Sequence, residues 1–503
     1  MKKAIALLVA TLMIFTLVTG CGNSASDSHT KDTVTILGHL ANTTLNPLSA
    51  ALMEDWVIDA LYDTLVRFGP DGSIQPMLAE SWTVESDGVT IVFNLRRGVK
   101  FHNGLELTAD DVIFSFDTLF NTPNYYYLQM YMSSWEKVDD YTVKVVKAAA
   151  YCETVNVLAV SLPIVCKAAY EEKGPDEFAR DPVGSGPYTF VSQGNDNTVT
   201  LKAFPNYWNG KPAIENLIVK APIDMSTAVV ALQNGEIDLI TDIPAAQWST
   251  VQSDNSLVFD STSGWSAMTL SFMNAVKDDV NLRKAIYHGI NRQNAITFGT
   301  EGTAVECKDI YSALAMKELS GAFDVPGYDV ELAKQYLAKS NYMAGTPIKL
   351  TVDSPDTVAV GQSIQNDMGQ IGITIDLVQV DSNAFNEMLQ NGELDLFLSS
   401  MGLAPVTVID MLLCWASDNP FWGPQMAHDD EYDEICSRFN AETDRDRLML
   451  MARRAMEIQY DLANHLGIYE ILFSVAHTKD ITGFMTLSAA ALAYYPGDLK
   501  PAN

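Results

Sequence analysis

Two short motifs contain residue types that could carry out chemistry. Gly184-Ser185-Gly186 places a serine between glycines, as a nucleophile turn or a phosphate loop would, and His102 follows a strand-like segment. The serine motif is neither GxSxG nor GxxxxGK[ST]. No acid or second histidine lies at triad or metal-site spacing from His102, although a base or ligand role stays open. We therefore expect both motifs to stabilise backbone turns.

The cysteines define a second set of reactive groups. After Cys21 the chain contains five more, at positions 152, 166, 307, 414 and 436, and an odd number leaves at least one free thiol. The nearest pairs are Cys152–Cys166 and Cys414–Cys436, but spacing alone does not decide whether either forms a disulfide. CxxC, HExxH and zinc-like Cys/His clusters are absent from the sequence, so no metal or other cofactor is expected.

The N-terminus has the features of an export signal. Lys2 and Lys3 precede an apolar run over residues 4–17, which is too short to cross a bilayer. The following Leu-Val-Thr-Gly-Cys resembles a bacterial lipobox, which predicts cleavage before Cys21 and its lipidation. Residues 22–31 are small and polar and predict a flexible tether. We therefore expect a signal peptide over 1–20 and a lipidated tether over 21–32.

The composition limits the possible partners. The formal charge is −31, and removing the first 20 residues, with their two lysines and no acid, brings it to −33. Such an acidic chain disfavours nucleic acid and anionic lipid surfaces as partners. We expect contact with the membrane through the lipid anchor only. The acidic residues are spread along the chain, which favours simple solubility as their role.

The elements that must position these residues alternate between strands and helices. Period-two patterns predict strands over 33–37, 89–95 and 142–147, and helical spacing predicts a helix over 48–66 that ends near the turn at 69–72. Thr108 followed by Asp110 and Asp111 predicts the start of another helix.

One nine-residue pattern occurs twice. Residues 231–239 read ALQNGEIDL and residues 388–396 read MLQNGELDL. In each copy Asn-Gly can end a helix in the left-handed region, and the residues after it can begin a strand. Chance similarity is the alternative. We interpret the pair as two lobes, each with a helix that leads into a sheet.

Several longer stretches resemble one known family. Residues 77–116, MLAESWTVESDGVTIVFNLRRGVKFHNGLELTADDVIFSF, resemble the signature of the extracytoplasmic solute-binding proteins of peptide/nickel-type ABC importers, family 5. Further matches, in the expected order, are DPVGSGPYTF, FPNYWNGKPAIENL, DDVNLRKAIYHGINRQNAI and YDVELAKQYLAKSNY. The resemblance runs from about residue 33 to near the C-terminus.

The resemblance implies a two-lobed α/β fold of the periplasmic-binding-protein type with a central ligand cleft. Lobe 1 would comprise 33–66, 183–263 and 475–503, with 67–182 as an extra subdomain, and lobe 2 would comprise 264–474. Two crossing segments, near Gly264 and Val475, would form the hinge about which the lobes close on a ligand.

The resemblance also implies where the ligand lies. In the family the cleft is lined by the first strand–helix loop, the crossing strand and a segment of the second lobe. These positions, with one further candidate on the signature helix, correspond here to Asn42, Thr43, Thr44, Phe114, Trp265, Ser266, Ser400, Met401 and Gly402. Trp265 is the strongest candidate because its ring offers a large contact area. The alternative for Trp265 is a core tryptophan beside the hinge.

This sequence departs from the family in the second-lobe segment. The segment often reads G-W-x-x-D, and its aspartate pairs with the α-ammonium of a peptide. Here Met401 replaces the tryptophan and Ala404 replaces the aspartate, although Asp410 could substitute. Without that carboxylate an ammonium group loses its charge partner. We therefore expect a solute other than an ordinary free-amine peptide, such as a modified peptide or a metal chelate.

The predicted function is capture of a peptide, a peptide-like molecule or another small polar solute outside the cytoplasm. A monomer, anchored at the cell membrane or in a periplasm, would deliver this solute to ABC permease subunits. The two alternatives are an extracellular enzyme, such as a peptidase-like hydrolase, and a ligand-sensing lipoprotein without a transport role. Turnover of labelled peptides would favour the enzyme, whereas stoichiometric retention would favour the binding protein.

Overall fold

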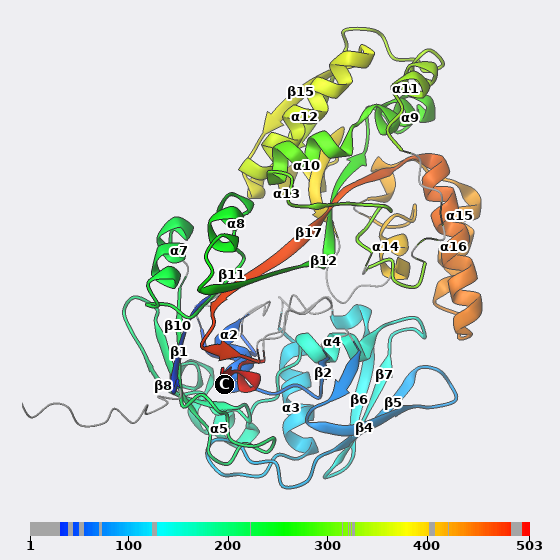
Figure 1. Cartoon of the computed structure of the whole chain (residues 1–503). Helices are drawn as coiled ribbons and strands as arrows, with labels where there is room; N and C mark the ends of the chain where they lie inside the picture. Colours follow the sequence, from blue (N-terminus) through cyan, green and yellow to red (C-terminus); the bar gives the residue numbers. More distant parts are fainter. Residues whose placement is uncertain are drawn as a thin grey trace, which may run out of the picture.

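Two long strands join the two lobes of the computed structural model (Figure 1). The structure describes residues 31–38, 44–49, 55–69, 73–122, 128–221, 223–313, 315–319, 321, 323, 327–401, 408–420, 422–483 and 495–502. We call the described residues up to 256 and from 479 onward the lower lobe, and those from 273 to 464 the upper lobe. The strands between them are β12 (Leu257–Phe272) and β17 (His465–Thr478).

One eleven-stranded sheet runs through both lobes, in the order β15-β14-β16-β12-β17-β11-β1-β10-β9-β8, with β13 paired to β17. The strands of its lower part are β1 (Thr33–Leu37), β8 (Tyr188–Gln193), β9 (Val199–Ala203), β10 (Asn216–Lys220) and β11 (Leu239–Thr241). Those of its upper part are β13 (Val305–Glu306), β14 (Pro347–Val352), β15 (Thr374–Gln379) and β16 (Leu396–Met401).

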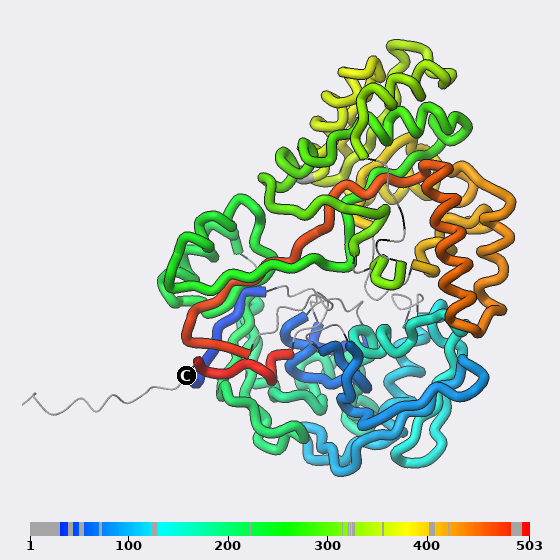
Figure 2. The backbone as a smooth tube through the Cα atoms, turned by 45° about the vertical axis from the view of Figure 1, so that its right-hand side comes forward, coloured from blue at the N-terminus to red at the C-terminus, as the bar shows by residue number. Residues whose placement is uncertain are grey.

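The two crossing strands are antiparallel and stay side by side from one lobe to the other (Figure 2). The first part of β12 pairs with the end of β17, and its last part lies between β17 and β16. Ser263 pairs with Leu472 and Ala267 pairs with Glu470, so the three residues from Gly264 to Ser266 face a single residue of β17. This bulge interrupts the ladder and redirects the side chains beside it.

A second sheet lies in the lower lobe and consists of four antiparallel strands in the order β4-β5-β7-β6. Its strands are β4 (Ala79–Val84), β5 (Thr90–Leu95), β6 (Met132–Asp139) and β7 (Thr142–Lys147). Helix α3 (Ala109–Phe120) packs against it and begins with a capping box formed by Thr108 and Asp111. Two short hairpins complete the strands, β2 (Val66–Phe68) with β3 (Ile74–Pro76) and β18 (Ile481–Thr482) with β19 (Lys500–Pro501).

The other helices cover the sheets. In the lower lobe they are α2 (Trp56–Leu61), α4 (Thr154–Val160), α5 (Lys167–Lys173), α6 (Pro175–Phe178), α7 (Met225–Gln233), α8 (Ala245–Gln252) and η3 (Pro496–Asp498). In the upper lobe they are α9 (Val280–Gly289), α10 (Arg292–Thr300), α11 (Val330–Leu337), α12 (Pro355–Ile371), α13 (Ser382–Asn391), α14 (Val408–Cys414), η2 (Gly423–Gln425), α15 (Asp430–Phe439) and α16 (Arg445–Leu462).

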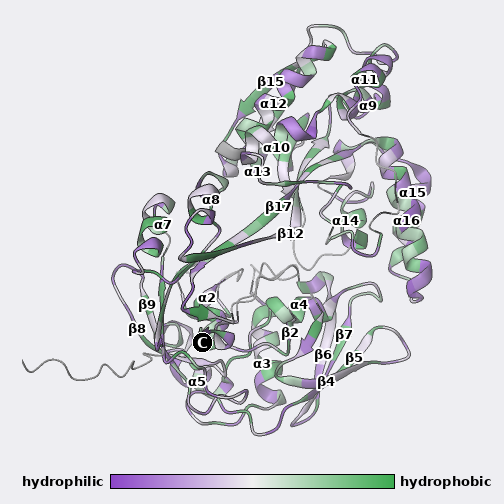
Figure 3. Ribbon diagram, viewed as in Figure 1, coloured by the Kyte–Doolittle hydropathy of each residue, from purple (hydrophilic) through white to green (hydrophobic). Residues whose placement is uncertain are grey.

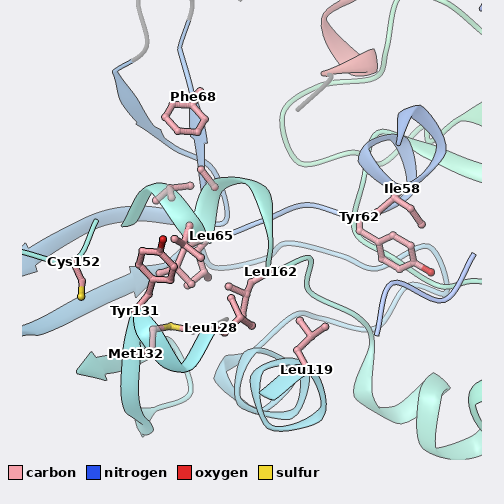
Figure 4. Packing of buried hydrophobic residues seen from close by; sticks show 14 of the residues in the cluster. Ile58, Tyr62, Leu65, Phe68, Leu119, Leu128, Tyr131, Met132, Cys152 and Leu162 are labelled. Atoms are coloured by element: carbon pink, nitrogen blue, oxygen red, sulfur yellow. The ribbon is translucent and has the colours of Figure 1, made fainter. Parts of the chain in front are cut away.

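The apolar core follows the amphipathic pattern of these elements. Helix α16 alternates hydrophilic and hydrophobic stretches (Figure 3), because its buried residues recur at helical spacing. In the lower lobe Leu65, Leu119, Tyr131 and Leu162 are among the buried side chains that pack together (Figure 4). The same cluster continues into α14, α15 and α16, so buried apolar side chains connect the lower lobe to one side of the upper lobe.

Several local predictions are confirmed. Strands β1 and β7 have the predicted bounds, and β5 begins one residue later than predicted. In both copies of the repeated pattern a helix ends near Asn-Gly, with Gly235 and Gly392 at φ of 73° and 72°, and a strand follows.

The helix predicted over residues 48–66 is wrong in its second half. Within the described part of that range only Trp56–Leu61 is α-helical, and Val66 already belongs to β2. The helix ends because Tyr62 is extended, with φ of −130° and ψ of 140°. Nearly every residue from 56 to 68 is buried, and such a segment shows no periodicity that separates helix from strand.

The question of disulfides is also answered. All five cysteines after Cys21 are free thiols, and Cys414 is the only one of them that is not fully buried. Neither Cys152–Cys166 nor Cys414–Cys436 is bridged. Cys21 itself lies outside the described residues.

Candidate ligand-binding site

Trp265 and Ser266 lie in the bulge of β12, where the chain passes between the lobes. Both side chains are half-buried. The carbonyl oxygen of Trp265 accepts a hydrogen bond of 2.8 Å from Ser312 Oγ, which also accepts one from the backbone N–H of Ala315 at 3.3 Å. Gly264 packs against Phe473 of β17, with an added Cβ only 2.8 Å from Cδ2 of that ring. The hydrogen bond from Ser312 and the packing of Gly264 against Phe473 therefore fix the position of the Trp265 backbone.

The end of β16 lies directly beside this bulge. Met401 pairs with Ala267 and Ser400 pairs with Met268, so the register brings the two predicted segments together. Ser400 is exposed. Met401 is buried, and its sulfur lies 3.7 Å from Ser271 Oγ, which places its side chain in the core of the upper lobe.

Thr44 and Phe114 form a second group, in the lower lobe. Thr44 Oγ1 accepts from the backbone N–H of Asn46, whose side-chain amide lies 3.3 Å from the Tyr170 hydroxyl. Phe114 of α3 meets the ring of Tyr170 edge-on, with 5.4 Å between the centroids. Thr44 and Phe114 are thus linked through Asn46 and Tyr170. Asn42, Thr43 and Gly402, the other predicted site residues, lie outside the described residues.

An ion pair connects the lobes at one side of this junction. Arg445, the first residue of α16, lies 3.3 Å from Glu153 Oε1 at the start of α4, and it also pairs with Glu318 of the upper lobe. Close by, Tyr151 and Phe439 meet edge-on at 6.5 Å. The residues of these pairs are up to 292 positions apart in sequence, and no local pattern indicates that they meet.

Asp410 is buried in the first turn of α14, close to the lower lobe. Burial and, after it, the negative charge of Asp410 together raise the pKa of the Cys152 thiol to about 11. The same two causes, burial first and the charge of Asp410 second, raise the pKa of the Cys414 thiol to about 11. The carboxyl of Asp410 therefore acts on thiols of both lobes.

The two motifs that suggested chemistry lie together and are structural. His102 Nδ1 accepts from the backbone N–H of Gly184 at 3.3 Å, and Nε2 donates to the carbonyl of Gly186 at 3.1 Å. The backbone N–H of His102 donates to the Gly184 carbonyl at 2.9 Å. Burial lowers the pKa of His102 to about 4, so the ring is neutral, as these bonds require. The expected turn-stabilising role of His102 is confirmed.

Asp63 is the centre of the adjoining hydrogen-bond network. Its carboxyl is fully buried and accepts from Ser185 Oγ at 3.1 Å, from the Tyr207 hydroxyl at 3.0 Å and from Trp208 Nε1 at 2.8 Å. Burial raises the pKa of Asp63 to about 7, although the three donors lower it in part. The family-like stretches around residues 184 and 207 thus build the scaffold of the lower lobe.

Three buried aromatic side chains of the upper lobe and the start of β17 form a stack. Trp415 is stacked between His465, at 3.9 Å, and Tyr311, at 5.3 Å. His465 Nδ1 lies 3.0 Å from Ser271 Oγ. Burial lowers the pKa of His465 to about 3, so the imidazole is neutral. The stack is thus joined through His465 to Ser271 of β12, whose hydroxyl also lies beside the Met401 sulfur.

Two further properties bear on the class of protein. In the part of the chain that the structure describes, no group of three or more His, Cys, Asp or Glu side chains could hold a metal ion. None of the described helices has both the length and the apolar character needed to cross a bilayer.

A two-lobed α/β fold whose lobes are joined by paired crossing strands is typical of binding proteins that close around a ligand. The chain matches the bacterial extracellular solute-binding proteins, family 5, over residues 73–421. It is 26% identical over 466 residues to di/tripeptide-binding protein 2 of Pseudomonas aeruginosa, with 84% of this chain and 86% of the relative covered. Heme-binding protein A of Haemophilus influenzae is 27% identical over 370 residues, covering 66% and 67%.

The structure of HbpA2 from Haemophilus parasuis shares the fold, with a TM-score of 0.80, 23% identity, and coverage of 94% of this chain and 100% of that one. The chain belongs to family 5 of the bacterial extracellular solute-binding proteins, the substrate-binding components of ABC transporters. This confirms the resemblance and the two-lobed fold. It also sets aside the hydrolase alternative, because these relatives bind solutes and are not enzymes.

Proposed function

We propose that this protein, anchored through a lipid on Cys21, captures a small peptide-like or other amphipathic solute between its lobes and delivers it to ABC permease subunits. The observation that carries the proposal is the bulge of β12, which places Trp265 where the chain crosses between lobes, beside the end of β16. We also propose that the lobes divide at residues 264 and 475 and that the protein acts as a monomer.

Apart from Met401, whose side chain lies in the core, the predicted site residues remain the proposed ligand contacts, with Trp265 as the principal one. Two of the relatives named above carry the names of different ligands, di/tripeptides and heme, so family membership alone does not define the solute. With Met401 in the core and Ala404 in place of the family aspartate, the proposed solute is not held by a free α-ammonium. The experiment that tests this is calorimetry with a peptide panel and its N-acetylated counterparts. Tight binding that is lost on acetylation would contradict it.

Replacing Trp265 with alanine is expected to weaken solute binding by roughly 10- to 100-fold, because a large ring at the centre of a closing cleft carries much of the binding energy. Native mass spectrometry of the purified protein first identifies solute retained from the host, and calorimetry then measures its affinity.

Trp265→Phe should recover part of the affinity. Phe298→Ala is the matched control, since this ring on α10 is 65% exposed and lies outside the proposed site. Unchanged affinity in Trp265→Ala would place the ligand elsewhere and make Trp265 a hinge tryptophan.

Reversing the charge of Arg445 is expected to open the lobes and weaken solute binding by roughly twofold to fivefold, since an exposed ion pair contributes about 0.2–1 kcal/mol. In Arg445→Glu the new carboxylate would face Glu153 and Glu318 as a like charge. X-ray scattering should show a larger radius of gyration, and the effect should shrink at high salt.

The charge swap Glu153→Arg with Arg445→Glu should restore part of the closure. Lys137→Glu is the control, because Lys137 pairs only with Asp110 and Asp140 of the same lobe among the described residues. An identical scattering profile for Arg445→Glu and the unmodified protein would refute the role of this pair in closure.

A further inference from the structure

A hollow of about 520 Å³ opens in the upper lobe between α9, α11 and α16. All of its lining residues belong to the upper lobe, and none of the nine residues predicted for the cleft is among them. It is therefore separate from the junction of the lobes, and its walls do not depend on lobe closure. Its volume is within the range of small-molecule sites.

The walls of the hollow are aromatic and are held in place. His288 is buried and stacks on Tyr336, with the centroids 5.6 Å apart and the planes at 5°, while Tyr287 meets His288 edge-on at 5.7 Å. His288 Nδ1 lies 3.1 Å from the carbonyl of Gly327, which fixes the ring. The hydroxyl of Tyr460 donates to Asp309 at 2.6 Å. Rings that are fixed before binding lose little entropy when a flat ligand packs on them.

The charges in the hollow fall into two kinds. Arg454 pairs with both oxygens of Glu431 at 2.7 Å and with Glu457 at 3.3 Å, so its charge is already balanced. Lys284 and Asp461 have no ion-pair partner within 4 Å among the described residues, and they do not pair with each other. The Lys284 ammonium lies 5.9 Å from the centre of the Tyr336 ring. The hollow thus offers one cation and one carboxylate, set apart, beside rigid aromatic surfaces.

We propose that this hollow binds a small zwitterion with a flat apolar body, of which an aromatic amino acid is the simplest example. The ligand carboxylate would pair with Lys284, the ammonium with Asp461, and the ring would pack on the walls formed by Tyr287, His288, Tyr336 and Tyr460. A simple anion is disfavoured by the unpaired carboxylate of Asp461, and a simple cation by the unpaired ammonium of Lys284.

The test uses 4-fluoro-L-phenylalanine as the probe and fluorine NMR on the full mature chain. We expect binding to the unmodified protein and a loss of roughly tenfold in each of Lys284→Gln and Asp461→Asn, about the effect of one charge-assisted contact. Lys349→Gln and Asp376→Asn are matched controls, because both residues are exposed on the far strands β14 and β15. Both controls should bind the probe as the unmodified protein does.

Two cut-down probes assign the charges separately. 4-Fluorophenylacetate lacks the ammonium and should respond to Lys284→Gln but not to Asp461→Asn, and 4-fluorophenethylamine lacks the carboxylate and should respond in the opposite way. Trp265→Ala should leave all three probes unaffected, which separates this hollow from the cleft. The proposal would be overturned by absence of binding up to about 5 mM probe. It would also be overturned if neither Lys284→Gln nor Asp461→Asn changed the affinity, or if Trp265→Ala abolished binding.

Discussion

Gly184→Ala is expected to destabilise the fold by at least about 3 kcal/mol and to reduce the yield of soluble protein. A Cβ at this position would overlap the carbonyl oxygen of Leu61 and come within 2.7 Å of the Tyr62 ring. Both obstacles are rigid, since Leu61 ends helix α2 and its carbonyl also accepts from Gly186 N–H at 3.0 Å. Denaturant unfolding followed by circular dichroism measures the change.

Gly369→Ala is the matched control for this variant. Gly369 is an exposed residue of α12 with nothing within 4 Å of an added Cβ, so alanine should stabilise the helix by about 0.5–1 kcal/mol. If Gly184→Ala were as stable as the unmodified protein, the close packing of the 184–186 turn against α2 would be refuted.

Asp63→Ala is expected to lower the free energy of unfolding by about 3–5 kcal/mol, because it leaves the hydroxyls of Ser185 and Tyr207 and the indole N–H of Trp208 without an acceptor in a dry environment. Ser185→Ala removes only one of these donors and should cost less. Comparable losses in the two variants would show that the carboxyl does not organise the network.

The same carboxyl should make stability depend on pH. Burial raises its pKa from 3.8 to about 7, so the folded state binds the proton more tightly than the unfolded state. Its stabilising contribution is complete below about pH 4 and is lost as the pH rises through about 7. Asp63→Asn cannot titrate. The stability of the unmodified protein relative to Asp63→Asn should therefore fall by up to about 4 kcal/mol across this interval.

Denaturant unfolding at pH 4, 5.5, 7 and 8 measures this difference. Ser185→Ala keeps the carboxyl and should retain the fall relative to Asp63→Asn. A difference that stays flat from pH 4 to 8 would mean that Asp63 ionises as readily in the folded as in the unfolded chain.

Local patterns predicted those parts of the fold whose structure is determined locally. Strands β1 and β7 alternate buried and less buried residues, and the Asn-Gly pairs end two helices where only a left-handed residue fits. The segment after α2 could not be predicted, because burial on all sides removes the periodicity. The resemblance supplied the two-lobed architecture, which no local pattern contains.

The candidate site was predictable only in part, because its residues are brought together by contacts that no local pattern contains. Trp265 follows a glycine at the crossing, and it lies at the junction of the lobes because β12 forms a bulge there. The register that creates this bulge depends on β17, about 200 residues later in the chain. The partners of Asp63 lie 122 to 145 residues away, and the half-buried Glu153 and the exposed Arg445 belong to different lobes. Nothing in a single sequence links such residues before the chain is folded.

The five free thiols mean that the described fold is completed without a covalent cross-link between these cysteines. No disulfide between Cys152, Cys166, Cys307, Cys414 and Cys436 has to form, and all of these thiols except Cys414 are buried once the chain is folded. Two large apolar cores stabilise this fold, whereas small secreted domains depend on disulfide bonds for their stability. The described fold therefore requires neither an oxidant nor a disulfide isomerase, and it is compatible with a reducing environment.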